Sequence, residues 1–219
     1  MTIIDCSAEM GKYHSDKVTL QKSDQDEMRG RRDAGRTRLE KGLGRDGHPV
    51  PNETASQGSY AMRTMIQHAA KDYDIDDGVY FKKSELVGPG GAEKSAAAAK
   101  EMVRKAVHDE KFKKAPECLK NCVRVYYDAG FHVDIPVYRT FERDGKEVYE
   151  LASSDWRASD ARAVTHWFKD ANKEKRQDES VECHGTFRGF VVTGLESRVR
   201  SASRVAAASP LRERVSASI

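Results

Sequence analysis

The tripeptide Asp74-Ile75-Asp76 constrains the fold of this chain more than any other feature. Aromatic and aliphatic residues alternate with acids from Tyr73 to Phe81, which is typical of a partly buried β-strand. Successive side chains of a strand point to opposite faces, so the carboxylates of Asp74 and Asp76 should share one face. Such a pair can hold one or two Mg²⁺ ions when a neighbouring strand adds a third carboxylate. The pattern therefore predicts a β-sheet that carries a phosphoryl-transfer site.

The third carboxylate is expected from Asp134, within residues 131–138 (Phe-His-Val-Asp-Ile-Pro-Val-Tyr). A short Asp-Ala-Gly segment separates this strand from the strand at 123–127, which predicts an antiparallel hairpin. Alternation places His132 and Asp134 on one face, toward the carboxylates of the first strand. His132 is interpreted as a structural histidine, and Asp77 should face the opposite side from the acidic pair.

A Gly58-Ser59-Tyr60 sequence precedes a helix expected over residues 61–70. Backbone N–H groups and the Ser59 hydroxyl would then lie at the positive end of a helix, where a triphosphate can bind. In isolation, a serine here would more often be a plain N-cap. The acidic pair that follows favours the phosphate interpretation. For Tyr60, stacking on a base and packing under the helix both remain open.

Several further elements follow from periodicity and from Gly, Pro and Ser positions. A long, solvated, charge-rich helix is expected within residues 16–45, ended by the glycines at 42, 44 and 47. Cys118 and Cys122 should be neighbours on a helix or at a helix end. The other expected elements are a helix at 93–108, a strand at 148–151 after an Asp-Gly turn, and a helix capped by Ser159-Asp160 that runs to about residue 171.

Composition indicates a soluble cytoplasmic protein. The chain is 38% hydrophobic and 33% charged, has no apolar run long enough to span a membrane, and begins without the pattern of a signal peptide. Its four cysteines lack zinc-site spacing, so they are expected to be reduced and unliganded.

The net charge of +3 comes from the C-terminal segment alone. Residues 183–219 contain six Arg and two Glu, whereas residues 1–182 contain 32 basic and 33 acidic side chains. This near-neutral main part disfavours an extended nucleic-acid surface, which needs clustered Lys and Arg. The segment from residue 183 lacks Lys, Asp, Asn, Gln, Trp and Tyr and shows no periodicity. It is interpreted as a disordered or out-of-frame tail, with a flexible regulatory tail as the alternative.

Three blocks in this order resemble one family, the bacterial cGAS/DncV-like nucleotidyltransferases (CD-NTases). They are residues 57–62 (Gln-Gly-Ser-Tyr-Ala-Met), residues 72–81 (Asp-Tyr-Asp-Ile-Asp-Asp-Gly-Val-Tyr-Phe) and residues 131–138. Weaker similarity covers residues 13–20 and the segment with Trp156, Ser159-Asp160 and Trp167. Members of this family make cyclic di- and trinucleotide signals in antiphage (CBASS) defence.

The resemblance implies an α+β fold, namely a polymerase beta-like nucleotidyltransferase palm with a mixed or antiparallel sheet flanked by helices and an N-terminal spine helix. It divides the chain into a spine helix and lead-in at 1–50, a palm at 51–182 and the tail at 183–219. Relatives continue into a helical half that closes the nucleotide pocket. Its absence here would leave this chain with little activity.

The resemblance also implies a site. Asp74, Asp76 and Asp134 would be the catalytic residues and the ligands of two Mg²⁺ ions, with Mn²⁺ as an alternative metal. The nucleotide-binding residues would be Gln57, Gly58, Ser59 and Tyr60. ATP, GTP or both would be substrates, and a regulatory protein of the defence operon would be a partner. The alternatives are nucleotidyl transfer to an antibiotic or to an RNA end, and a palm fragment without catalysis.

Overall fold

The computed structural model describes residues 5–69, 71, 73–128 and 130–182. The chain divides into two compact units, Met1–Lys173 and Glu174–Ile219. The first unit holds the sheet, the helices packed on it and every candidate site residue. The tail expected at 183–219 lies outside the described residues. In the described part, no helix has the length and apolar character needed to cross a membrane.

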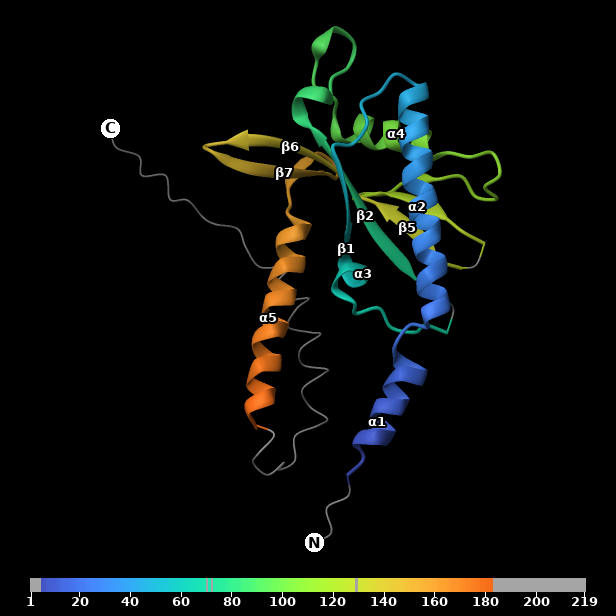
Figure 1. Ribbon diagram of the computed structural model, residues 1–219. Helices are drawn as coiled ribbons and strands as arrows, with labels where there is room; N and C mark the ends of the chain where they lie inside the picture. Colours follow the sequence, from blue (N-terminus) through green and yellow to red (C-terminus); the bar gives the residue numbers. More distant parts are fainter. Residues whose placement is uncertain (1–4, 70, 72, 129, 183–219) are drawn as a thin grey trace, which may run out of the picture. The chain divides into compact units, whose positions relative to one another are not determined.

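An eight-stranded mixed sheet forms the centre of the first unit (Figure 1). Strand β2 is parallel to β5 and β6, and every other pairing is antiparallel. The strand order is β3-β4-β5-β2-β6-β7-β8, with β1 also paired to β2. The expected α+β class with a sheet flanked by helices is confirmed. The strands are β1 (Glu53–Gln57), β2 (Asp74–Lys82), β3 (Glu117–Cys118), β4 (Val123–Tyr126), β5 (His132–Ile135), β6 (Val137–Arg143), β7 (Lys146–Ala152) and β8 (Trp156–Ala158).

Strands β5 and β6 act as one strand with a break at Pro136. Both pair with β2 in the same register, which continues from Asp76↔Asp134 to Val79↔Val137. Pro136 has no N–H to donate, but its carbonyl oxygen accepts a hydrogen bond from the Val79 N–H at 2.9 Å. The predicted hairpin is confirmed, since β4 and β5 pair antiparallel. The single uninterrupted strand expected over 131–138 is therefore two strands in one register.

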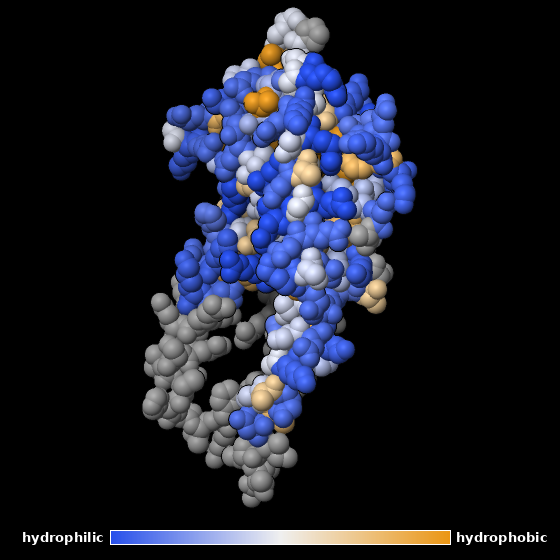
Figure 2. All heavy atoms as spheres, turned by 45° about the vertical axis from the view of Figure 1, so that its right-hand side comes forward, coloured by the Kyte–Doolittle hydropathy of each residue, from blue (hydrophilic) through white to orange (hydrophobic). Residues whose placement is uncertain are grey.

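Two helices cover one face of the sheet: α2 (Lys22–Arg45), the expected spine helix, and α4 (Ala96–Val107) (Figure 1). Between them and the sheet lies the main hydrophobic core, to which β2 contributes Val79 and Phe81. The outer surface of α2 is charged, and hydrophilic residues cover most of the face shown in Figure 2.

The helix α2 passes through two of the three glycines that were expected to end it and stops before the third, Gly47, whose φ is 68°. It continues through Gly42 and Gly44 to Arg45 because α2 packs against α4 at this point. A Cβ on Gly42 would overlap the backbone of Ala106 in α4, so glycine permits the close approach of the two helices. Tertiary packing thus outweighs the low helix propensity of glycine.

Two other expectations about helices were wrong. The short helix α3 spans only Gly58–Met62, because Arg63 adopts a left-handed conformation with φ 59° and ends it. Cys118 lies in strand β3, and Cys122 follows it after a tight turn, so the two are not helical neighbours. The three cysteines in the described part of the chain are free.

The remaining helical segments lie before α2, after β2 and after β8 in the chain. The helix α5 (Ala161–Glu182) begins where expected, because Asp160 Oδ1 accepts hydrogen bonds from the N–H groups of Arg162 and Ala163. It extends well beyond residue 171. The segment α1 (Ser7–Tyr13) and the π-helical turn η1 (His14–Val18) precede α2 and bury no residues, and the 3-10 turns η2 (Lys83–Glu85) and η3 (Pro89–Gly91) follow β2.

The contact between α2 and α4 leads to a first prediction. Gly42→Ala should destabilise the fold by about 1–3 kcal/mol, because the added methyl overpacks the helix contact. Gly30→Ala is the matched control in the same helix, where an added Cβ meets no atom within 4 Å. That change should stabilise by about 0.5–1 kcal/mol through helix propensity. Urea unfolding of both variants measures the difference, and equal shifts would contradict the packing role of Gly42.

Candidate active site

The parallel pairing of β2 with β5 brings the predicted acids together. Asp74 lies opposite His132 in this register, and Asp76 lies opposite Asp134. Residues in register on neighbouring strands point to the same face of a sheet. The structure therefore places Asp134 beside the acidic pair, on the face of the sheet that α2 and α4 do not cover.

Three side chains on this face form a group that could hold a metal ion. One ligand atom from each of Asp74, His132 and Asp134 lies within 4.8 Å of the other two. His132 and Asp134 are buried, and Asp74 is partly exposed. Carboxylate oxygens suit Mg²⁺, and an added imidazole nitrogen suits a transition metal such as Mn²⁺. The donor set thus fits a divalent cation.

His132 was interpreted from sequence as a structural histidine, yet it belongs to this ligand group. The signal for it was the strand alternation that places His132 on the carboxylate face. What the sequence does not indicate is its position directly opposite Asp74, because that depends on the parallel register.

Asp76 carries an electrostatic strain that also points to a cation. Burial first, and then the negative charges of Asp74 and Asp134, together raise the pKa of Asp76 to about 6. Arg124 opposes this shift. A divalent cation among these carboxylates would stabilise the charged form of Asp76.

Arg124 on β4 binds the third acid of the site. It lies opposite Asp134 in the β4–β5 pairing, and its Nε and Nη2 donate to the two carboxylate oxygens at 2.7 Å each. Pairing with this carboxylate raises the pKa of Arg124. Cys122 is also close, and burial followed by the charge of Asp134 raises the pKa of the Cys122 thiol to about 12. The acid is therefore held by a charged fork beside a protonated thiol.

Asp77 faces the opposite side of β2, as expected. There it accepts a bidentate interaction from Arg36 of α2 and a hydrogen bond from the Ser56 hydroxyl at 3.3 Å. This partly buried pair joins α2 to the sheet. Its chemistry is structural and lies away from the candidate site.

Gly58 lies directly against Asp76 of the acidic pair. Its φ is +60°, and a Cβ at this position would overlap Asp76 Oδ2. Only glycine fits this left-handed conformation and close approach at low cost. The backbone at residues 58–59 therefore borders the same face as the three acids.

The side chain of Gln57 has a structural role. Its Nε2 donates to the Tyr80 hydroxyl at 2.6 Å, and its Oε1 accepts from the Tyr138 hydroxyl at 3.1 Å. Gly78 leaves the space that the amide of Gln57 occupies. The amide is thus directed at two tyrosines and not at the acids.

Tyr60 packs toward α2. Its hydroxyl accepts a hydrogen bond from Arg29 Nε at 3.2 Å, and the Arg32 guanidinium lies 5.4 Å from the centre of its ring. The sequence left open whether Tyr60 stacks on a base or packs within the fold, and these contacts are packing contacts. Ser59 is partly exposed in the same short helix, whose five residues are too few for a strong helix dipole.

Next to the acids, tyrosine side chains pack against one another on the same face of the sheet. The rings of Tyr80 and Tyr138 stack with centroids 4.7 Å apart. Arg162 of α5 lies over Tyr80 at 4.3 Å and pairs with Glu53. These contacts fix the start of α5 beside the site, and no pattern in the sequence indicates them.

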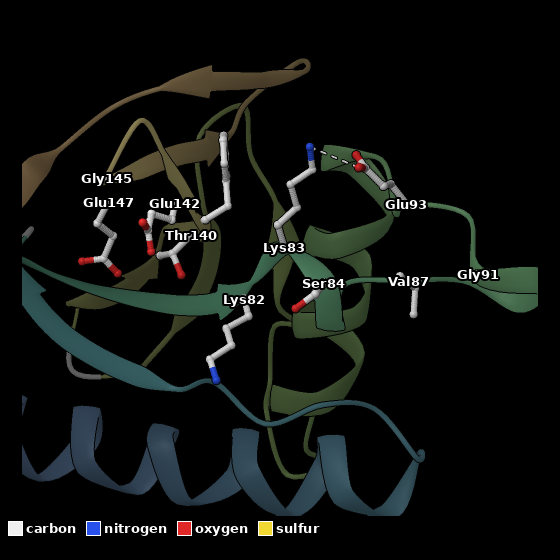
Figure 3. Close-up of a pocket in the computed structure, with 11 residues that line it drawn as sticks. Lys82, Lys83, Ser84, Val87, Gly91, Glu93, Thr140, Glu142, Gly145 and Glu147 are labelled. Carbon is white, nitrogen blue, oxygen red and sulfur yellow. Dashed lines mark ion pairs between the residues drawn. The ribbon is translucent and has the colours of Figure 1, made fainter.

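A separate cavity of about 990 Å³ lies between the end of β2 and the β6–β7 hairpin (Figure 3). Lysines and glutamates line it together, and Lys83 pairs with Glu93 at 3.1 Å. None of the candidate site residues lines this cavity.

Residues 52–138 match the family model described as "Cyclic GMP-AMP synthase DncV-like, nucleotidyltransferase domain". This part of the chain is therefore similar to a DncV-like nucleotidyltransferase domain. The matched range contains β1, β2, β5 and all the acids of the candidate site. The resemblance noted from the three sequence blocks is confirmed.

Solved structures agree with this domain in fold. CdnG of Bradyrhizobium diazoefficiens, solved in complex with GTP, aligns with a TM-score of 0.53 at 18% identity, covering 69% of this chain and 42% of that one. CdnC of E. coli MS115-1 with ATP aligns with a TM-score of 0.54 at 18% identity, covering 76% of this chain and 51% of that one. Escherichia coli DncV bound to 3'-deoxy GTP aligns with a TM-score of 0.54 at 17% identity, covering 75% of this chain and 62% of that one. The chain thus spans about half the length of these structures.

The raised pKa of Asp76 predicts that the stability of the metal-free protein depends on pH. Its pKa of about 6 exceeds the ordinary 3.8, so the stability tied to this proton is full below about pH 4 and is lost as the pH rises through about 6. Asp76→Asn should therefore stabilise the metal-free protein at pH 7.5 by about 2 kcal/mol.

Thermal melts in EDTA at pH 4 and pH 7.5 test this expectation. The advantage of Asp76→Asn should be small at pH 4 and present at pH 7.5. An equal effect at both pH values would show that the Asp76 carboxylate is not strained in the folded state.

Proposed function

We propose that this chain is a metal-dependent nucleotidyltransferase that joins NTPs into a cyclic di- or trinucleotide, with residues 51–182 as its catalytic palm. In each step a 3′-hydroxyl oxygen loses its proton and bonds to an α-phosphorus. The bond between this phosphorus and the oxygen that bridges it to the β-phosphate breaks, and pyrophosphate leaves. The observation that carries the proposal is the grouping of Asp74, His132 and Asp134 beside Asp76 on one face of a DncV-like domain.

The acids would hold the metal. Asp74, Asp76 and Asp134 are the proposed ligands for Mg²⁺, with Mn²⁺ as an alternative, and His132 lies within reach of the same position. Bound there, two such cations would supply charge stabilisation to the attacking and leaving oxygens. Asp134 would orient the attacking 3′-hydroxyl or accept its proton.

The backbone at Gly58-Ser59 would position the phosphates. It lies against Asp76, so N–H groups and the Ser59 hydroxyl there would act within reach of the metal ligands. Gln57 and Tyr60 would support this turn through their contacts with Tyr80 and Arg29 rather than through the nucleotide. Positioning of this kind supplies a large part of the rate of phosphoryl transfer.

Free nucleotides are the proposed substrates. The near balance of charge over residues 1–182 favours small nucleotides over an RNA end, and the solved relatives include complexes with GTP and ATP. CdnC has also been solved in complex with a HORMA protein. A regulatory protein partner and a role in cytoplasmic antiphage signalling are proposed here on the family likeness.

The test is an incubation of purified protein with Mg²⁺ and labelled NTPs, followed by phosphatase. Cyclic products retain the label and linear ones lose it. Asp74→Ala and Asp134→Ala should each reduce cyclic product by at least about a hundredfold, because a two-cation site loses a ligand.

Asp144→Asn is the control, since this acid lies in the β6–β7 turn with φ 53°, where asparagine is equally tolerated. Its product yield should equal that of the wild type. Label transferred to RNA or to an antibiotic instead would contradict the proposed substrate class, and Mg·NTP binding without product would contradict catalysis by this chain.

A further inference from the structure

The contact between Arg124 and Asp134 joins a cation to a proposed metal ligand. Arg124 Nε donates to Asp134 Oδ1 and Arg124 Nη2 donates to Asp134 Oδ2, each at 2.7 Å, which is the strong bidentate form of this interaction. The side chain of Asp134 is 8% exposed and that of Arg124 is 27% exposed. The pair is therefore largely removed from water, where its charges act strongly.

The same carboxylate belongs to the candidate metal group. An oxygen of Asp134 lies within 4.8 Å of ligand atoms of Asp74 and His132. Any divalent cation placed among these three must bind next to the guanidinium charge. It must also share the carboxylate electrons that Arg124 already polarises.

Electrostatics gives the sign of this effect. A single positive charge fixed beside a doubly charged cation repels it, and in a partly buried site the repulsion is less screened than in water. Magnesium gives up its water ligands reluctantly and is usually bound by one or two carboxylates together with substrate phosphates. Arg124 should accordingly make cation binding weak until phosphate oxygens add to the ligand set.

We propose that Arg124 is a positioning residue that holds Asp134 in place and keeps the affinity of the site for a free divalent cation low. The inference rests on the proposed function, because it assumes that Asp134 is a metal ligand. Loading of the cation then depends on the phosphates of a bound nucleotide. The protein holds its acids ready without binding a metal ion tightly in the absence of substrate.

The chain offers a matched control for this pair. Arg36 and Asp77 form a second bidentate pair, with exposures of 28% and 4%, and Asp77 lies on β2 beside Asp76 but on the opposite face. Removing Arg36 also leaves a buried carboxylate without its guanidinium. It changes the charge on the core side of the sheet rather than at the metal group.

The experiment is a titration of the full chain with Mn²⁺ in the absence of nucleotide, in which electron paramagnetic resonance measures the concentration of the free ion. Arg124→Gln should bind Mn²⁺ tighter than the wild type, on the order of tenfold. Arg124→Lys keeps the charge and should stay within about threefold of the wild type. Arg36→Gln should lower the melting temperature without tightening Mn²⁺ binding.

A second comparison serves if Arg124→Gln does not fold. Asp134→Asn is compared with the Asp134→Asn/Arg124→Gln double variant, in which two neutral amide side chains replace the ion pair. Because the charge of Arg124 also acts on Asp76, its removal should again tighten Mn²⁺ binding.

The outcomes separate the two proposals. Mn²⁺ binding that Asp74→Ala weakens but that Arg124→Gln leaves unchanged or weakens would overturn the role of Arg124 while leaving the metal site intact. Binding that is unaffected by Asp74→Ala would overturn the metal site itself and with it the proposed function. Equal tightening in Arg36→Gln would show a general charge effect and would also overturn the inference.

Discussion

The parallel pairing of β2 with β5 is the contact on which the candidate site depends. It aligns Asp74 with His132 and Asp76 with Asp134, and the same register continues past Pro136 into β6. A shift of one residue would turn each of these side chains to the other face of the sheet. The apolar residues that alternate with the acids prevent such a shift, because they are buried against helices on the opposite face. The hydrophobic core thus determines the geometry of the polar site.

Two arginine–aspartate pairs of the same geometry lie on opposite faces of this part of the sheet. Arg36 and Asp77 join the spine helix to β2, where the carboxylate has only structural partners. Arg124 and Asp134 join β4 to β5, where the carboxylate also belongs to a group of metal-ligand type. The same arginine–aspartate pairing therefore joins a helix to the sheet on one face and borders the candidate metal site on the other. Burial among like charges raises the pKa of Asp76, which is the kind of strain that functional sites commonly hold.

Local sequence patterns predicted the parts of the fold that local physics determines. Strand alternation placed Asp74, Asp76 and Asp134 on one face, and the Asp-Ala-Gly turn predicted the β4–β5 hairpin. Local patterns gave wrong or incomplete predictions where contacts between residues far apart in the chain determine the structure. Gly42 remains helical because α4 packs against it, and the role of Arg124 appears only when β4 and β5 are set side by side. His132 was assigned to the correct face, but its closeness to Asp74 depends on a pairing between segments far apart in the chain.

We expect the β2–β5 register to build a divalent-cation site from these acids. The most direct test is anomalous scattering from a crystal of the protein grown with Mn²⁺ and a non-hydrolysable NTP. We expect an anomalous peak between Asp74 and Asp134, on the face opposite α2 and α4, with the triphosphate beside Gly58. A nucleotide bound elsewhere, or Mn²⁺ bound without contact to Asp74 or Asp134, would contradict this expectation.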